Sequence, residues 1–195
     1  LKDTATRNIL IKLGHDGKPA EFQSNSFGGR VDGIVGLVYS EASTEMELPV
    51  IGLAKDATVS AGSRPSTNTV TYDFYLKNLS PLSTLSALSL PDDLGSVFGV
   101  KTVDWDFVSL TKVSGPASVE VNAAYDGDSV IEMINAGSSL ASQSSAQLQL
   151  VIEVYKTPGT YSNQATVTAE DSIGNVYTDL SNSGKAAAID PDSDG

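Results

Sequence analysis

The stretch GTYSNQATVTAEDSIGNVYTDLSNSG, residues 159–184, is the clearest β-hairpin of the chain. Ala165, Val167 and Ala169 alternate with polar residues, and this period of two is typical of a strand with one buried face. The residues DSIGN that follow supply turn chemistry, and a return strand begins at Val176. We therefore interpret the upstream segments as strands that pack against the buried face of this hairpin.

Asn163 breaks the pattern at the start of the hairpin. It shares the parity of Ala165 and Val167, so its amide points toward the core if the register holds. A buried polar group needs a hydrogen-bond partner. The sequence therefore predicts a partner for this amide inside the protein.

The composition favours an all-β protein. Charged residues make up 18% of the 195 residues, whereas Ser, Thr, Gly, Ala and Val are plentiful. The length suits one large domain, or one large and one small domain. The absence of cysteine excludes disulfides and thiolate metal sites.

The net charge of the chain indicates which kinds of partner it can bind. A formal net charge of −12 argues against nucleic acid and anionic membranes, because both attract basic surfaces. It suits a secreted protein that meets divalent cations. No apolar run reaches the ~20 residues that span a bilayer, so no membrane insertion is expected. The start LKDTATRN has no signal-peptide core, so any leader or preceding domain is expected outside this sequence.

Residues 1–48 form a first block of short strands. Three short strands are marginally stable alone, so the block is expected to add strands to the main domain or to end a preceding module. The acidic residues 41–49 end in proline and indicate a connector. The expected strands are residues 8–13, 19–23 and 31–39, with a tight turn at 14–18 and a loop at 24–30.

Residues 49–185 show a regular succession of strands and turns that favours an immunoglobulin-like β-sandwich. Residues 79–90 are interpreted as a loop followed by a strand, and residues 130–142 as a mixed segment with one short helix. Residues 186–195 are expected to be an acidic linker. The other expected strands are residues 51–59, 70–78, 100–110, 118–123 and 146–155, followed by the hairpin.

Several segments of this second block occur in a familiar order. They are IGLAK (51–55), VTYDFYLKN (70–78), PDDL (91–94), YDG (125–127), residues 137–150, GTYSNQA (159–165) and DPDSDG (190–195). In this order the chain from about residue 50 to 195 resembles the Ig-like repeats of unknown function that occur in tandem in bacterial surface proteins and adhesins. The resemblance implies a non-enzymatic sandwich that spaces, stiffens or presents something at the cell surface, with neighbouring repeats of the same chain as partners.

Lys55, Asp92 and Asn163 each share the parity of neighbouring apolar residues, so three polar side chains are expected to aim inward. Domains of the kind that the chain resembles can form an isopeptide bond between a lysine of the first strand and an asparagine of the last. The chemistry needs a buried lysine, whose desolvation favours the neutral amine, and a protonated acid that polarises the amide and assists loss of ammonia. Asp92 is the candidate acid, with Asp93 or Asp73 as alternatives.

The same three residues have an ordinary interpretation. Lys55 would extend to solvent at a sheet edge, Asn163 would bond to backbone, and Asp92 would cap a turn. Because parity slips easily over short strands, the pattern favours this ordinary arrangement.

Two acidic motifs are candidate calcium sites. Asp190, Asp192 and Asp194 stand on alternate residues before a glycine, as at the start of a calcium loop with oxygen ligands. No later ligand follows, so a solvated acidic tail is the preferred interpretation in this chain, whereas a calcium-stiffened linker is preferred if the motif lies within a longer protein. Asp126 and Asp128 flank a glycine and suit calcium or an ordinary Asp-Gly turn.

The sequence gives little support for an enzyme. The one histidine, His15, lies in the turn GHDGK, so no Ser-His-Asp arrangement or zinc site is expected. Asp104 and Asp106 around Trp105 could form a glycosidase pair, but strand alternation favours a core tryptophan with two solvated aspartates.

The sequence therefore predicts an extracellular or cell-surface structural repeat, with isopeptide or calcium stabilisation. The alternative is an adhesion module that binds a carbohydrate or a protein on another surface. A concave, aromatic-lined patch would favour binding, whereas a closed sandwich would favour a spacer.

Overall fold

The structure, a computed structural model, describes residues 23–29, 38–44, 51–155 and 159–185. The chain divides into two units, residues 1–46 and residues 47–195. Within the described residues, no helix is long and apolar enough to cross a membrane.

The first unit contains an antiparallel pair of strands, β1 (Gln23–Gly29) and β2 (Val38–Thr44). The predicted loop at 24–30 was therefore wrong, and β2 runs into the segment 41–49 that was predicted as a connector. Ser, Asn and Gly indicate turns in sequence, but here the pairing of two chain segments decides the conformation. The predicted strand at 8–13 and the turn with His15 lie outside the described residues.

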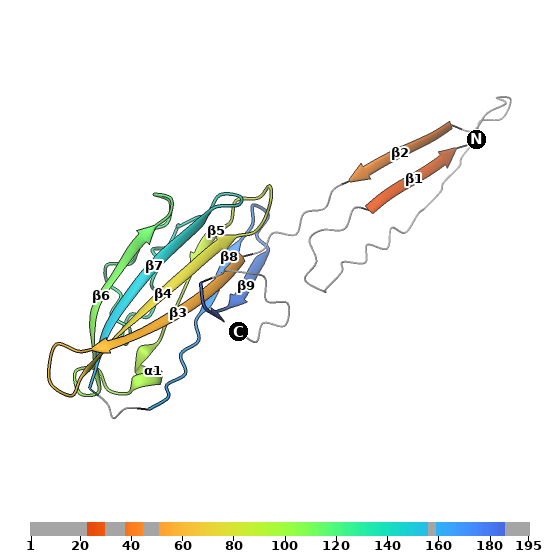
Figure 1. Cartoon of the computed structure of the whole chain (residues 1–195). Helices are drawn as coiled ribbons and strands as arrows, with labels where there is room; N and C mark the ends of the chain where they lie inside the picture. The colour runs from red at the N-terminus through yellow and green to blue at the C-terminus, as the bar shows by residue number, and fades with distance from the viewer. Residues whose placement is uncertain (1–22, 30–37, 45–50, 156–158, 186–195) are drawn as a thin grey trace. The chain divides into compact units, whose positions relative to one another are not determined.

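The described residues of the second unit form two β-sheets that share one hydrophobic core (Figure 1). The larger sheet has the order β10-β3-β4-β7-β6, and the smaller sheet the order β5-β8-β9. The larger sheet comprises β3 (Ile51–Ala61), β4 (Asn68–Asn78), β6 (Trp105–Ser114), β7 (Ser145–Val154) and β10 (Asn182–Ser183). The smaller sheet comprises β5 (Ser86–Ser89), β8 (Thr166–Glu170) and β9 (Val176–Leu180).

Strand alternation explains how the two sheets pack. In β4, Val70, Tyr72, Phe74 and Leu76 are buried, while the residues between them are less covered. Because successive side chains of a strand point to opposite faces, the buried set faces one side of the sheet. Strands β7 and β8 alternate in the same way and complete the core. The predicted all-β fold is confirmed at this level.

Strand β3 runs antiparallel to β4 along its whole length, and β10 runs parallel to part of β3. The hydrogen bond from Leu53 N to Asp179 Oδ2, 2.6 Å long, ties β3 to β9 of the smaller sheet. The first and last strands among the described residues of the second unit are therefore adjacent.

Two strand predictions of this unit need correction. The strand predicted at 100–110 begins only at Trp105, because Val103 N and Asp104 N bond to Val100 O and turn the chain. The strand predicted at 118–123 is a single β-bridge between Val121 and Ile134. Short polar segments such as these gain too few ladder bonds to form a full strand.

The helix expected within 130–142 is absent, and the one short helix of the described residues is α1 (Leu94–Phe98). Asp93 caps its start by accepting a hydrogen bond from Ser96 N at 3.1 Å. Leu94 and Phe98 anchor the helix in the core. Residues 115–144 instead form a long connection that contributes Val119, Met133, Ile134 and Leu140 to the core.

Candidate functional site

Lys55 extends into the interior from β3. In the antiparallel register it lies opposite Phe74 of β4, and it shares the inward parity of Leu53. Only 4% of its side chain is exposed. Its Nζ lies 4.4 Å from the centroid of the Tyr72 ring and 4.7 Å from that of Phe74. The prediction that Lys55 would reach solvent at a sheet edge is therefore wrong.

Asp92 lies between β5 and α1, and only 3% of the residue is exposed. Its backbone is fixed from two sides, because Asp92 N donates to Ile131 O at 2.9 Å and the Tyr125 hydroxyl donates to Asp92 O at 3.1 Å. The carboxyl group can therefore point inward without moving its backbone. The predicted turn-capping role falls to Asp93 instead.

Asn163 lies in the irregular segment that precedes β8, and it is half-buried. The strand predicted to include Asn163 begins three residues later, at Thr166. Two hydrogen bonds fix the backbone just after it, because Ala165 N donates to Ser181 Oγ at 3.0 Å and Ser181 N donates to Ala165 O at 2.8 Å. This clamp between Ala165 and Ser181 limits how far Asn163 can move.

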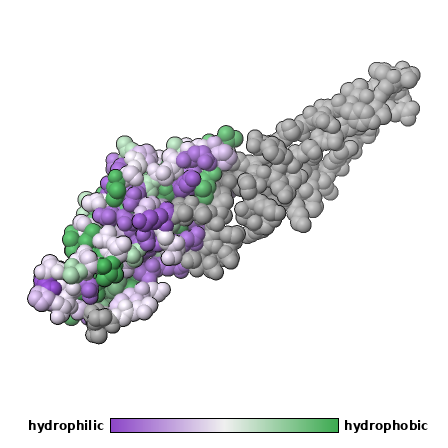
Figure 2. Space-filling model, viewed as in Figure 1, coloured by the Kyte–Doolittle hydropathy of each residue, from purple (hydrophilic) through white to green (hydrophobic). Residues whose placement is uncertain are grey.

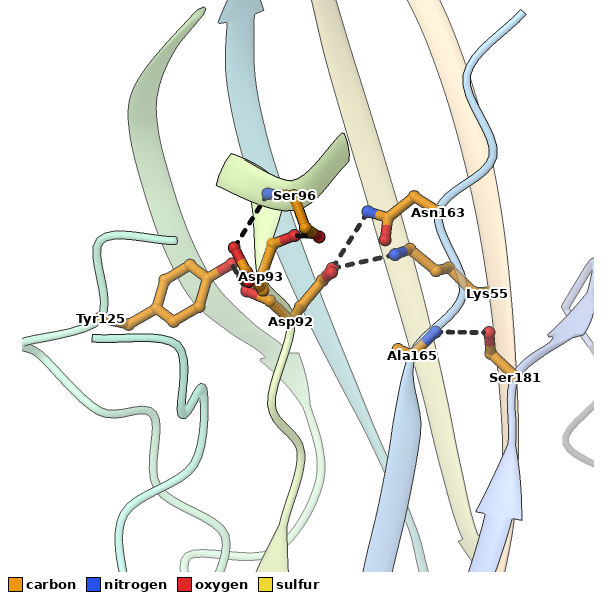
Figure 3. A network of polar contacts seen from close by, with 8 residues as sticks. All are labelled: Lys55, Asp92, Asp93, Ser96, Tyr125, Asn163, Ala165 and Ser181. Carbon is orange, nitrogen blue, oxygen red and sulfur yellow. Dashed lines mark hydrogen bonds and ion pairs between the residues drawn. The ribbon is translucent and has the colours of Figure 1, made fainter. Parts of the chain in front are cut away.

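The three side chains meet at one carboxylate oxygen (Figure 3). Asp92 Oδ2 accepts a hydrogen bond from Lys55 Nζ at 2.9 Å and another from Asn163 Nδ2 at 3.3 Å. The structure therefore brings together the three residues that the sequence singled out. They come from three separate elements, so their meeting is a property of the fold.

Burial shifts the pKa values of Lys55 and Asp92 in opposite directions. Burial lowers the pKa of Lys55, and the nearby Asp92 carboxylate opposes only part of this shift. Burial also raises the pKa of Asp92, against the attraction of Lys55 and the hydrogen bond from Asn163. Both shifts favour a neutral amine next to a protonated carboxyl group. This is the state in which the amine is a nucleophile.

The arrangement can support exchange of an amide. A neutral Lys55 amine can attack the side-chain carbonyl carbon of Asn163, and Asp92 can carry a proton between the two nitrogens. The other acids considered from the sequence are engaged elsewhere. Asp93 caps α1, and Asp73 accepts hydrogen bonds from Gln147 and Gln149 at 3.1 Å each.

Tyr72 and Tyr125 belong to the site although sequence reasoning did not name them. Tyr72 shares the inward parity of Phe74, and Phe74 is the β4 residue opposite Lys55. The sequence pattern therefore indicated that Tyr72 faces the same side of the sheet as Lys55. The position of Tyr125 depends on a loop and had no such signal.

A groove of about 630 Å³ opens beside Lys55 and Asn163. Lys55, Asn163 and Tyr72 line it together with Phe98 and Tyr161. The Phe98 and Tyr161 rings contact each other, with centroids 5.4 Å apart. The site is thus buried but reachable from one side.

Asp126, one of the candidate calcium ligands, is already engaged by hydrogen bonds and an ion pair. Asp126 Oδ1 accepts hydrogen bonds from Asp128 N and Val130 N, and Asp126 Oδ2 lies 2.8 Å from Lys101 Nζ. These contacts hold the pKa of Asp126 well below its usual range, the hydrogen bond with Lys101 contributing most. Among the described residues, no three His, Asp or Glu side chains are grouped as a metal site. Asp190, Asp192 and Asp194 lie outside the described residues.

The interpretation of Trp105 as a core residue is confirmed. The tryptophan is fully buried, and its Nε1 donates to Gly99 O at 3.1 Å. Asp104 Oδ2 accepts a hydrogen bond from Val100 N, and Asp106 accepts one from the Tyr155 hydroxyl. Each of the two aspartates therefore accepts a hydrogen bond from a residue of the surrounding fold.

No protein-family model matches the chain, and a search of curated proteins finds no match. The function is therefore inferred from the geometry around Lys55, Asp92 and Asn163.

Proposed function

We propose that the chain is a structural repeat of an extracellular bacterial surface protein, an Ig-like sandwich locked by an isopeptide bond between Lys55 and Asn163. The observation that carries this proposal is the shared oxygen. Asp92 Oδ2 contacts the attacking nitrogen at 2.9 Å and the leaving nitrogen at 3.3 Å. The two-sheet core and the adjacency of β3 to β10 near the end of the unit support the sandwich part of the proposal.

The reaction balances without an added reagent. Lys55 Nζ attacks the side-chain carbonyl carbon of Asn163, and a new C–N bond forms. Asp92 passes a proton from the lysine nitrogen to Asn163 Nδ2, and the bond from that nitrogen to the carbonyl carbon breaks. Ammonia leaves, and the acid returns to its starting state. No atom is oxidised or reduced.

Peptide mapping tests this bond directly. Proteolysis of the purified chain should release one branched peptide that contains both Lys55 and Asn163, identified by fragmentation in a mass spectrometer. Two separate linear peptides, each with its unmodified residue, would contradict the cross-link.

A ligand-binding adhesion module is the second candidate, and the groove favours it. The groove is concave and has three aromatic residues in its wall, Tyr72, Phe98 and Tyr161. Tyr72 and Phe98 are only 6% and 2% exposed, however, so their rings offer little face to a sugar. Exposed apolar side chains on the face seen in Figure 2 lie scattered among polar ones. We therefore place the spacer first.

A glycan-array screen separates these candidates. If the chain is a spacer, no glycan should bind the wild-type chain more tightly than it binds the Tyr161→Ala variant. Selective binding that Tyr161→Ala abolishes would favour the adhesion module.

Calcium remains part of the proposal through the acidic residues at 190–194 and the pair Asp126 and Asp128. An ion that binds only the folded state raises the melting temperature by mass action. We expect a modest rise on adding calcium, reversed by a chelator. An unchanged melting temperature would argue against any calcium site in the chain.

A further inference from the structure

The amide of Asn163 has to be held beside Asp92, although Asn163 lies outside the strands. Residues 159–165 form an irregular segment before β8, and its end is fixed by the two hydrogen bonds between Ala165 and Ser181. An extended chain spans at most about 3.6 Å per residue, so an anchor two residues away still lets Asn163 move by several ångströms. A misplacement of about 1 Å can slow a reaction roughly 100-fold. The reaction therefore gains from a second anchor before Asn163.

Tyr161 supplies such an anchor, two residues before Asn163. Its ring contacts the ring of Phe98, with the centroids 5.4 Å apart and the planes inclined at 40°. Phe98 is the last residue of α1 and is only 2% exposed, so it offers a fixed surface to the ring of Tyr161. All three residues line the same groove. The segment that carries Asn163 is thus held on both sides of the reacting amide.

Helix α1 joins this anchor to the acid. Asp92 lies two residues before the helix, and Phe98 ends it. The start of the helix is held in place because Leu94 N donates to Gly127 O at 2.9 Å. A helix of five residues is a short rigid unit, so the carboxyl group of Asp92 and the ring of Tyr161 are placed against one and the same body.

We propose that Tyr161 is a positioning residue for the isopeptide bond, because its ring on Phe98 holds the amide of Asn163 beside Asp92. This inference rests on the cross-link proposed above. The contact raises the fraction of molecules in which Asn163 Nδ2 lies at hydrogen-bond distance from Asp92 Oδ2, 3.3 Å in the structure. In this role Tyr161 neither gains nor loses a proton, so the atoms balance as described for the reaction of Lys55 with Asn163.

The variants Tyr161→Ala and Tyr161→Phe test the role of the ring. The chain is made by cell-free translation, synthesis is stopped, and loss of ammonia is followed over time by intact mass spectrometry. We expect Tyr161→Ala to form the bond roughly two- to tenfold more slowly than wild type, the effect of losing one contact between aromatic rings. Tyr161→Phe keeps a ring on Phe98 and should restore the rate to within about twofold of wild type. A rate in Tyr161→Phe as low as in Tyr161→Ala would overturn the role of the ring contact.

Tyr177→Ala is the matched control. Tyr161 and Tyr177 are both partly buried and packed against the hydrophobic core. Tyr177 lies on β9 opposite Ala169 of β8, six residues beyond Asn163. We expect Tyr177→Ala to lose ammonia at the wild-type rate. Equal slowing in the two alanine variants would show that the loss of either tyrosine disturbs folding in general, and would overturn the specific role of Tyr161.

The folded fraction of each variant separates positioning from general destabilisation. Lys55→Met cannot form the bond, so the stability of Tyr161→Ala and Tyr177→Ala can be compared in this background by urea denaturation. We expect Tyr161→Ala to remain folded under the conditions of the rate measurement, so that its slower reaction is a property of the folded chain. A rate that falls only in proportion to the folded fraction would overturn the proposal.

The outcomes for the bond and for Tyr161 are distinguishable. If the wild-type chain never loses ammonia, the cross-link fails, and the positioning role of Tyr161 fails with it. If wild type and Tyr161→Ala lose ammonia at the same rate, the cross-link stands and only the role of Tyr161 is overturned.

Discussion

The buried pair of Lys55 and Asp92 is unusual at the scale of single residues. Their side chains are 4% and 1% exposed, and such a pair seldom gains enough attraction to offset the loss of hydration. Replacement by apolar residues would often be neutral or stabilising. We propose that the pair serves the chemistry of the cross-link rather than the stability of the fold.

Removing the acid should stop the reaction. We expect Asp92→Asn to retain its full sequence mass, because no group can then carry a proton from Lys55 to Asn163. The control is Asp93→Asn, which removes a carboxylate one residue away that caps α1. This control should lose ammonia normally and cost at most ~1 kcal/mol of folding stability. Cross-linking in Asp92→Asn would show that another group supplies the acid.

The rate of cross-linking should depend on pH in a bell shape. At low pH Lys55 is protonated and cannot attack, and because burial lowers its pKa this limb lies below the ordinary value of 10.5. At high pH Asp92 is ionised, and because burial raises its pKa this limb lies above the ordinary value of 3.8. The two limbs belong to the coupled pair, so each is a macroscopic value. A rate that rises steadily from about pH 4 to about pH 10 would contradict the role of a protonated acid.

At the scale of elements, the loop around Gly127 holds the acid in place. Gly127 O accepts hydrogen bonds from Leu94 N and Gly95 N, and thus joins this loop to α1 shortly after Asp92. Gly127 has φ +75°, and an added Cβ would lie 2.6 Å from Leu94 Cδ1 and 3.0 Å from Trp105 Cη2. Both the backbone conformation and the close packing therefore require glycine here.

We expect Gly127→Ala to destabilise the fold by about 2–5 kcal/mol, from strain of the backbone and crowding of the core, and to slow cross-linking. Gly174→Ala is the control, since Gly174 has φ +86° but open space around the added methyl group. It should cost only about 1–3 kcal/mol, the strain alone. Chemical denaturation measures both, and equal losses would show that packing at Gly127 contributes nothing.

The strands with strict alternation could be predicted from the sequence, and the connections between them could not. Alternation in β4 and β7 gives both the strand and the buried face, because the period of two is a local property. The same rule suggested an inward direction for Lys55 and Asp92, but the sequence favoured the ordinary arrangement, and Asp92 lies between β5 and α1 rather than in a strand. The alternation rule fails for residues 115–144, because their core contacts depend on isolated bridges such as Val121 to Ile134.

The meeting of the three side chains follows only in part from the sequence. Strand parity applies to Lys55 in β3 alone, because Asp92 and Asn163 lie outside the strands. The shared oxygen of Asp92 depends on sheet packing and on the loop at Tyr125. The position of Asn163 also depends on the clamp between Ala165 and Ser181, which pairs two segments that a sequence pattern treats separately.

At the scale of the whole second unit, the bond would close the chain from residue 55 to residue 163. By the chain-entropy estimate used for disulfides, closing a loop of about 100 residues is worth roughly 4.7 kcal/mol. This is a large share of the ~5–15 kcal/mol stability of an ordinary domain. An amide cross-link also resists reduction, which suits a chain without cysteine.

The variant Asn163→Ala should therefore lower the free energy of unfolding by roughly 4 to 5 kcal/mol, since it removes the bond and leaves Lys55 paired with Asp92. Ser162→Ala, at the exposed neighbouring position, should change it by at most ~0.5 kcal/mol. Urea denaturation of the two variants beside wild type gives both values. A loss in Asn163→Ala no larger than in Ser162→Ala would mean that no cross-link stabilises the wild-type chain.

The most direct test of the cross-link is the intact mass of the purified wild-type chain. We predict a mass lower than the sequence mass by one ammonia. Lys55→Ala and Asn163→Ala should each show the full mass of their own sequence. A wild-type mass equal to the sequence mass would contradict the cross-link, and would leave Lys55, Asp92 and Asn163 as a buried hydrogen-bonded cluster.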